Sequence, residues 1–571
     1  MRPSPLPGVL AALGLLAALQ TFADAPAAPA AAPVAAAAIA AAPTVVDPPV
    51  THAPLVQAAE AGDGSALTLL EAAAGPAARR EAARERSSDG TTALHWAVYH
   101  DDVPLVRALI AAGADVNARN DYGSTPMAEA AVRADVHVLR DLLRAGADVD
   151  APNADGQTAL MVLARTSNVD AAKLLLRHGA HVNAREIWRG QSALMWAAAE
   201  RQPAMVKLLI AYGADVDARS HVNVWQRQVT AEPRMQARPS GGFTPLLYAA
   251  RSGCVECARL LLEAGARINL TDPDGVTPLL LATLNLNFDT AALLVRAGAD
   301  VNRWDLWGRS PLYAAVDMDT LPVGGRADRP STDATTALAL MDMLLEAGAD
   351  PNLQLKLFPP YRSLRDDRGA DAVLGVGTTP LLRAAKAGDL PAIRLLLAHG
   401  AIADLPTAAG VTPLMAAAGV GASPIDTRGR YKTEGQALDA VDMLLAGGAD
   451  VNARDGGGQT ALHGAALWGW DSVVKALVAH HADPAARDAR GRTPADVALG
   501  SGGGASGRAG TQSHPETAAL LRQLMADAAV APQTGAAQPQ ASAAAGRDDA
   551  ARKAGGLPAQ AAASAVTSAA R

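Results

Sequence analysis

The feature that most constrains the fold of this chain is a short motif that returns at intervals of 33 residues. The motif begins with Thr or Ser, usually continues with Pro-Leu or Ala-Leu, and is followed by small residues. Its first residue falls at Thr92, Thr125, Thr158, Ser192, Thr244, Thr277, Ser310, Thr379, Thr412, Thr460 and Thr493. Three longer intervals, of 52, 69 and 48 residues, mark insertions into the array. Such a period predicts a row of small units, each of which buries its apolar face against the next.

The residues within one unit predict two helices. The Thr or Ser hydroxyl can cap the first helix, and the Pro that often follows suits its first turn. Later in the unit, a Leu-rich stretch such as LIAAGADVNAR (109–119) predicts a second helix that ends at a Gly, which favours the left-handed cap. Aromatic residues make up only 3% of the 571 residues, whereas Leu and Ala are abundant. This composition suits thin, closely packed helical layers.

The motif resembles the ankyrin repeat, which reads Thr-Pro-Leu-His-x-Ala, then a second helix, then Gly-Ala-Asp-Val-Asn. TALHWA (92–97) and TALHGA (460–465) keep the His, and other units have Met, Leu or Tyr there. The resemblance covers roughly residues 54–526. It implies an all-α ankyrin-repeat solenoid of about 11–12 helix-turn-helix units with β-turn fingers, placed here at 53–526. Residues 54–70 are expected to form a degraded first unit.

The two flanks differ from the repeats. Residues 1–25 contain Arg2, an apolar stretch and small residues, an order typical of a secretory signal peptide. We therefore expect an exported chain, periplasmic or secreted, without a transmembrane segment once mature; the alternative is a membrane anchor left uncleaved. Residues 26–52 are Ala/Pro-rich and predict a linker, and 527–571 predict a disordered Ala-rich tail.

Five insertions interrupt the array, and function on repeat scaffolds is carried by such variable parts. They lie near 220–241, 319–335, 353–376, 420–434 and 500–514. The first and third fall in turns between units and are expected to extend the finger side. The second and fourth fall between the helices of one unit and are expected at the opposite edge.

Aromatic and arginine side chains in the fingers and insertions are the candidates for partner binding, because these residue types dominate binding hot spots. The set is Tyr122, Trp188, Trp225, Trp307, Phe358, Tyr361, Arg362, Arg430 and Tyr431. The competing interpretation is that they pack between fingers or fold their loops onto the stack. Trp96 and Trp196 occupy normally packed helix positions and are assigned to the core.

Both cysteines of the chain, Cys254 and Cys257, form a Cys-x-x-Cys motif. Other units have a helix-capping Asp or Asn at the first position and a packed apolar residue at the second. The spacing allows a local disulfide in an exported protein. A catalytic dithiol of the thioredoxin type expects a βαβ context, which the repeats do not supply. A structural disulfide and two ordinary small residues remain the alternatives.

Known catalytic and ligand motifs give no alternative function. Gly502, Gly504 and Gly507 match Gly-x-Gly-x-x-Gly, but no predicted strand precedes them, so the match lacks its mechanism. We predict no catalytic residue, no metal site and no cofactor. A formal net charge of −7 disfavours a general nucleic-acid binder, which needs a basic surface.

These observations together predict a non-catalytic scaffold that binds a protein partner of unknown identity. Binding would use the finger tips, the concave face and the inserted loops. Three alternatives differ in compartment or chemistry. The chain could be a secreted effector acting on host proteins, an accessory protein that holds an anionic ligand on its arginine-bearing loops, or a structural spacer in the envelope.

Overall fold

A computed structural model describes residues 53–228, 235–320, 331–357, 373–421, 432–500 and 513–530. The expected signal peptide, the linker and the part of the tail beyond residue 530 lie outside the described residues. Within the described residues the fold is mainly helical, with twelve helix pairs, one additional helix and one two-stranded hairpin. The predicted mainly helical repeat fold is therefore confirmed.

Each unit consists of a first and a second helix. The first helices are α1 (Pro54–Ala61), α4 (Ala93–Tyr99), α6 (Pro126–Arg133), α8 (Ala159–Thr166), α10 (Ala193–Ala199), α12 (Pro245–Ser252), α14 (Pro278–Leu284), α16 (Pro311–Asp319), α18 (Pro380–Ala387), α20 (Pro413–Ala417), α22 (Ala461–Trp468) and α24 (Pro494–Ala498). The second helices are α2 (Ser65–Ala72), α5 (Val103–Ala112), α7 (Val136–Arg144), α9 (Val169–Arg177), α11 (Pro203–Ala211), α13 (Val255–Glu263), α15 (Phe288–Arg296), α17 (Ala337–Glu346), α19 (Leu390–Ala398), α21 (Glu434–Ala446), α23 (Asp471–Ala479) and α25 (Pro515–Val530). The additional helix α3 (Pro76–Ala82) packs against α2 and α5.

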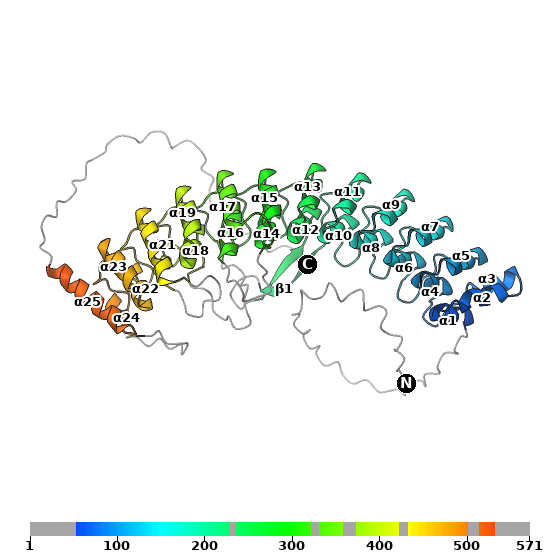
Figure 1. The fold of residues 1–571 in the computed structure, drawn as a ribbon, viewed down its shortest axis with the longest axis horizontal. Coiled ribbons are helices and arrows are strands. Elements are labelled where there is room, and N and C mark those ends of the chain that lie inside the picture. Colours follow the sequence, from blue (N-terminus) through cyan, green and yellow to red (C-terminus); the bar gives the residue numbers. More distant parts are fainter. Residues whose placement is uncertain are drawn as a thin grey trace, which may run out of the picture. The chain divides into compact units, whose positions relative to one another are not determined.

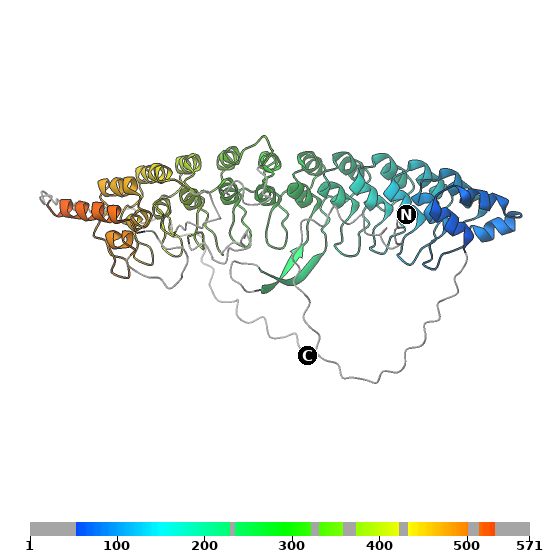
Figure 2. The same ribbon diagram turned by 60° about the horizontal axis from the view of Figure 1, so that its bottom comes forward.

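The helices form two layers that run along the chain in sequence order (Figures 1 and 2). Each first helix packs against the first helices of the preceding and following units, as α10 does with α8 and α12, and the second helices do the same. One hydrophobic core of mostly Leu, Ala, Val and Met side chains lies between the layers from α1 to α25. Trp96 and Trp196 are partly buried against this core, in agreement with their assignment.

The motif residues act at the helix ends as their chemistry predicts. The hydroxyls of Thr125 and Thr277 accept hydrogen bonds from the N–H groups three residues on, both at 3.1 Å. Thr158 is an exception, because its buried hydroxyl makes no hydrogen bond. Gly113 follows α5 with a φ of 87°, a left-handed value that favours glycine. After α23, His481 takes the same kind of conformation with a φ of 68°.

The insertion at 220–241, whose conformation the sequence left open, contains the β-strands of the described residues. This segment forms an antiparallel hairpin of β1 (Val222–Gln228) and β2 (Met235–Gly241), in which Val222 pairs with Gly241 and Gln228 with Met235. Figure 2 shows the hairpin projecting from the side of the helices on which the turns between units lie. The insertion therefore extends the finger side, as its place between units predicts.

Two insertions of different kinds have described ends that lie close together, although most of each lies outside the described residues, so that their placement on opposite edges stays a prediction. A Cβ added to Gly421, which follows α20, would lie 2.2 Å from Cγ2 of Val373, which precedes α18. Lys432, at the other end of the same insertion, is buried, and its Nζ donates to the carbonyl oxygen of Ala416 at 2.6 Å.

Candidate partner-binding surface

Trp188 stands at the tip of the turn before α10, where its side chain is 68% exposed. The turn is organised from below by the buried carboxylate of Glu186, which accepts hydrogen bonds from three backbone N–H groups, including that of Trp188 at 2.7 Å. The indole Nε1 donates to Oδ1 of Asp155 in the preceding turn at 3.1 Å. The indole is therefore held in a fixed orientation while most of its surface stays in solvent.

Neighbouring fingers are tied to one another by backbone hydrogen bonds. The N–H of Asp121 donates to the carbonyl of Asp89 at 2.9 Å, and the N–H of Ile187 donates to that of Asp155 at 3.0 Å. Tyr122, which follows the first of these donors, is 65% exposed. Because these two pairs of fingers are bonded, the exposed side chains on them keep a defined position relative to the neighbouring finger.

The hairpin carries Trp225, which is 57% exposed, and is anchored to the following finger. Asp274 is almost fully buried and accepts hydrogen bonds from both hairpin arginines, from Arg227 Nη2 at 2.5 Å and from Arg238 Nη2 at 3.2 Å. A two-stranded hairpin alone is only marginally stable in water. These two charged hydrogen bonds therefore fix the position of the hairpin, which the hydrogen bonds between its own two strands would not do alone.

Alternation along β1 gives the hairpin two different faces. Trp225 and Arg227 share one face with Arg238, which pairs with Trp225 across the strands. Val222 and Val224 point to the other face, and both are exposed. The hairpin thus presents apolar side chains on both faces, although neither face rests on the helical core.

The finger that anchors the hairpin contains a carboxyl group with a perturbed pKa. Burial, together with the neighbouring carboxylates Asp274 and Asp305, raises the pKa of Asp272 to about 6. Two backbone N–H groups oppose this shift, because Asp272 Oδ1 accepts hydrogen bonds from Asp274 and Val276, both at 2.9 Å. The finger therefore carries a carboxyl group that titrates well above the ordinary range of aspartate.

Trp307 is a correction to the expected surface, because it is only 4% exposed. The guanidinium of Arg309 lies 4.7 Å from the centre of its ring. The beginning of the next insertion covers the same turn, since the N–H of Lys356 donates to the carbonyl of Trp307 at 2.8 Å. The exposed indole of this finger is instead Trp304, at 47%. Trp304 was not among the binding residues predicted from the sequence.

Five of the expected binding residues lie outside the described residues. They are Phe358, Tyr361, Arg362, Arg430 and Tyr431. Of the predicted residues that the structure describes, Tyr122, Trp188 and Trp225 are exposed on the fingers and the hairpin. We call these three residues, together with Ile187, Val224 and Trp304, the finger surface.

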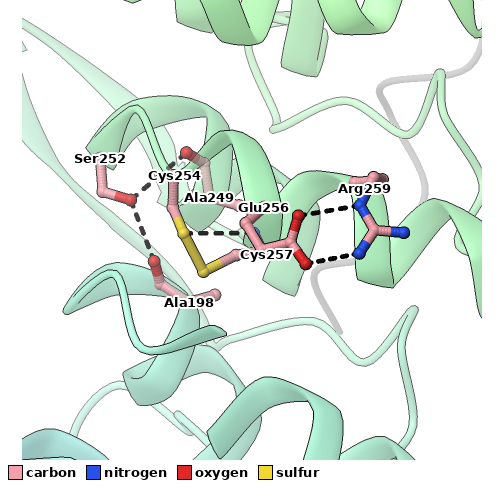
Figure 3. The surroundings of a disulfide bond; sticks show 7 residues. All are labelled: Ala198, Ala249, Ser252, Cys254, Glu256, Cys257 and Arg259. Carbon is pink, nitrogen blue, oxygen red and sulfur yellow. Dashed lines mark hydrogen bonds and ion pairs between the residues drawn. A yellow bond between two sulfur atoms is a disulfide. The ribbon is translucent and has the colours of Figure 1, made fainter. Parts of the chain in front are cut away.

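Cys254 and Cys257 are joined by a disulfide at the start of α13 (Figure 3). Both residues are buried. Cys254 occupies the capping position that Asp102 and Asp389 fill in other units, and its Sγ accepts a hydrogen bond from the N–H of Cys257 at 3.2 Å. Next to it, the Ser252 hydroxyl donates to the carbonyl of Ala198 in the preceding unit at 2.9 Å. The pair is a local crosslink inside the stack with no accessible substrate face.

Metal ligands and membrane-spanning helices are two further features that bear on function. The described segments contain no group of three or more His, Cys, Asp or Glu side chains that could hold a metal ion. None of the helices in the described ranges is long and apolar enough to cross a bilayer.

Comparison with known proteins identifies the repeats. The family model described as ankyrin repeats in three copies matches residues 55–153, 129–220, 246–324 and 432–527, and the model of the single ankyrin repeat matches 376–408. A similar curated protein is the human SH3 and multiple ankyrin repeat domains protein 2, which is 30% identical over 145 residues. That match covers 22% of this chain and 8% of the human protein.

Proposed function

Because the chain belongs to the ankyrin-repeat family, we propose that it is an exported, non-catalytic scaffold that captures a partner protein on its finger surface. Ankyrin repeats indicate a protein–protein interaction scaffold, and the family is generally non-catalytic. The N-terminal sequence and the disulfide support an exported location. The hydrogen bonds that hold the exposed finger residues in place support partner binding on the finger surface.

The observation that carries the proposal is the way in which exposed aromatic side chains are held. Large apolar groups in contact with water are costly, and contiguous exposed apolar surface marks interaction sites. Trp188 is fixed by hydrogen bonds to Glu186 and Asp155, and Trp225 lies on a hairpin fixed by Asp274. Rigid aromatic side chains lose little conformational entropy when a partner covers them, so binding energy is used efficiently.

Two features support an exported location. Residues 1–25 have the charged, apolar and small-residue order of a secretory signal peptide. The Cys254–Cys257 disulfide is the kind of bond that persists in oxidising compartments and is rare in the cytosol. The test is to fractionate producing cells and sequence the N-terminus of the protein. We expect a mature chain beginning near residue 24 or 26 outside the cytosol, and an intact Met1 in the cytosolic fraction would contradict the location.

Site-specific photo-crosslinking in living cells tests the binding surface. A photoreactive amino acid such as p-benzoylphenylalanine would replace Trp188 in one variant and Trp225 in another. Tyr212, an exposed aromatic residue at the end of the second helix α11, provides the matched control. We expect the same crosslinked partner from positions 188 and 225, because both lie on the finger surface.

The control decides the outcome. A crosslink from position 212 to the same partner, equal in yield to those from 188 and 225, would show that the adducts reflect proximity rather than a defined surface. Failure of both finger positions to crosslink any protein would contradict the proposed function.

A further inference from the structure

Arginine side chains lie over aromatic rings along one face of the first-helix layer. The guanidinium carbon of Arg133 is 4.5 Å from the ring centre of Tyr99, that of Arg165 is 4.7 Å from Trp196, and that of Arg251 is 5.1 Å from Tyr248. The first two join the first helices of neighbouring units, α4 with α6 and α8 with α10, whereas the third lies within α12. We call this row the arginine–aromatic face.

The three guanidinium groups have hydrogen-bond donors to spare. Within the described part of the chain, neither a carboxylate nor any other acceptor pairs with the guanidinium of Arg133, Arg165 or Arg251. Arg133 and Arg251 are exposed, and Arg165 is partly exposed. A guanidinium stacked on a ring is fixed in orientation, while the N–H groups at its edge stay available. Such groups are prepared for bidentate hydrogen bonds to carboxylates.

From this arrangement we propose that the arginine–aromatic face binds an extended, acidic segment of the partner protein. The inference rests on the proposed function, since it names the chemistry of the partner that the same scaffold captures. Val132, which is exposed on α6 beside Arg133, and the partly buried ring of Trp196 provide apolar contact area beside the charges. Mixed arginine and aromatic surfaces of this kind dominate binding hot spots.

The spacing of the units fixes the spacing of the acidic residues. Neighbouring packed helices lie roughly 10 Å apart, and an extended chain advances about 3.3 Å per residue. Arg133 and Arg165 belong to adjacent units, and Arg251 lies two units beyond Arg165. Because the Arg133 side chain reaches back over α4 and that of Arg165 reaches forward over α10, their guanidinium groups lie about two helix spacings apart, and carboxylates that reach both are separated by about six residues. The guanidinium groups of Arg165 and Arg251 lie between one and two spacings apart, which corresponds to about five residues.

The same face disfavours a polyanion such as nucleic acid. Glu129 lies on α6, the helix that carries Arg133, and Glu200 directly follows α10, the helix that carries Trp196. Their charge would repel a continuous line of phosphates, which needs an uninterrupted basic surface. A peptide can place neutral residues opposite these carboxylates and acidic residues opposite the arginines.

Binding of a defined peptide to the full chain tests the inference. The probe is a fluorescein-labelled peptide of about 18 residues with Glu at positions 4, 10 and 15 in a Gly, Ser, Ala and Val background, measured by fluorescence anisotropy. We compare it with a peptide of the same composition in which the three Glu are adjacent. The protein variants are Arg165→Gln and Arg251→Gln, with Arg177→Gln on the exposed surface of the second helix α9 as matched control.

We expect Arg165→Gln and Arg251→Gln each to weaken binding about tenfold, because each removes a charge-assisted pair of hydrogen bonds. Arg177→Gln should bind as the unchanged protein does, and the adjacent-Glu peptide should bind several-fold more weakly. Circular dichroism spectra that match the parent would show that the variants remain folded.

Three outcomes would overturn the inference: binding that is unaffected by both variants, equal binding of the two peptides, or equal competition by oligothymidylate of the same charge. Dimers of the chain that the peptide dissociates would also overturn it, because the face would then belong to a second copy. Crosslinks from Trp188 and Trp225 are read separately. If they persist while the arginine variants have no effect, only this inference fails.

Discussion

Replacing Asp274 by Asn should release the hairpin from the stack without unfolding the repeats. Asp274 anchors Arg227 at 2.5 Å and Arg238 at 3.2 Å, and no more than 27% of either arginine side chain is exposed. Asn has nearly the same size and can still accept one hydrogen bond. It carries no charge, however, so both guanidinium groups lose their counterion in a place that solvent reaches poorly.

The magnitude follows from the two arginine hydrogen bonds that the substitution weakens. A hydrogen bond to a charged group contributes about 1.5–3 kcal/mol, and partial exposure together with the remaining Asn acceptor reduces the sum for two. A destabilisation of about 2 kcal/mol corresponds to a roughly 30-fold larger opening equilibrium for the hairpin. The thermal midpoint of the whole chain should change little, because the Asp274 carboxylate bonds the hairpin and is not part of the hydrophobic core between the helices.

Hydrogen–deuterium exchange read by mass spectrometry measures this directly. Peptides covering residues 220–243 should exchange roughly 30-fold faster in Asp274→Asn, in line with that opening equilibrium, whereas peptides from α10 and α14 keep their rates. Asp141→Asn is the matched control, because Asp141 pairs at 2.7 Å with Arg107, whose side chain is largely exposed. Unchanged exchange in the hairpin of Asp274→Asn would refute the anchoring role of Asp274.

Three other substitutions test separate parts of the structure. Asp272→Asn should raise the thermal midpoint at a pH well above 6, because the pKa of Asp272 is raised to about 6 and its charged form costs stability above that pH. The gain should shrink as the pH falls below the raised pKa toward the ordinary value of aspartate, and a gain that is constant with pH would contradict the assignment. Thr277→Val should lower the free energy of unfolding by about 1 kcal/mol, because the helix loses the hydroxyl that caps it. Thr158→Val should leave the free energy of unfolding unchanged or raise it, because the Thr158 hydroxyl has no hydrogen-bond partner. Equal destabilisation by the two substitutions in unfolding experiments would contradict this distinction. The double substitution Cys254→Ser and Cys257→Ser should lower the thermal midpoint by only a few degrees and leave crosslinking to the partner intact. Loss of crosslinking in a folded double variant would show that the disulfide has a direct role in binding.

The repeat array could be predicted because its signals are local. Thr277 with Pro278 specifies the start of α14, and Gly113 specifies the end of α5, so each helix boundary is encoded within a few residues. The hydrophobic period then places the same faces against each neighbouring unit. Thirty-three-residue spacing thus determined the fold class, the number of units and the assignment of Trp96 and Trp196 to the core.

The surface could not be predicted to the same degree, because it depends on contacts between distant segments. Trp304 and Trp307 lie in one turn, and only the approach of Lys356 from the next insertion determines that Trp307 is covered. The alternation in β1 contained a strand signal. Its anchor, Asp274, lies 47 residues beyond Arg227 and belongs to another unit. Neither partner reveals the other from sequence alone.

The disulfide and the arginine–aromatic face show the same limit. Comparison with other units placed Cys254 at a helix cap, but the sequence left open whether it pairs with Cys257. Arg165 and Trp196 lie 31 residues apart, close to one repeat period, which is the only trace of their contact in the sequence.

Hydrogen exchange with and without the crosslinked partner tests the central claim most directly. The claim predicts that exchange slows in the turn at 186–190 and in the hairpin at 222–241 and stays unchanged in the second helices α9 and α11. Protection confined to those second helices, with the fingers exchanging at their free rate, would contradict it.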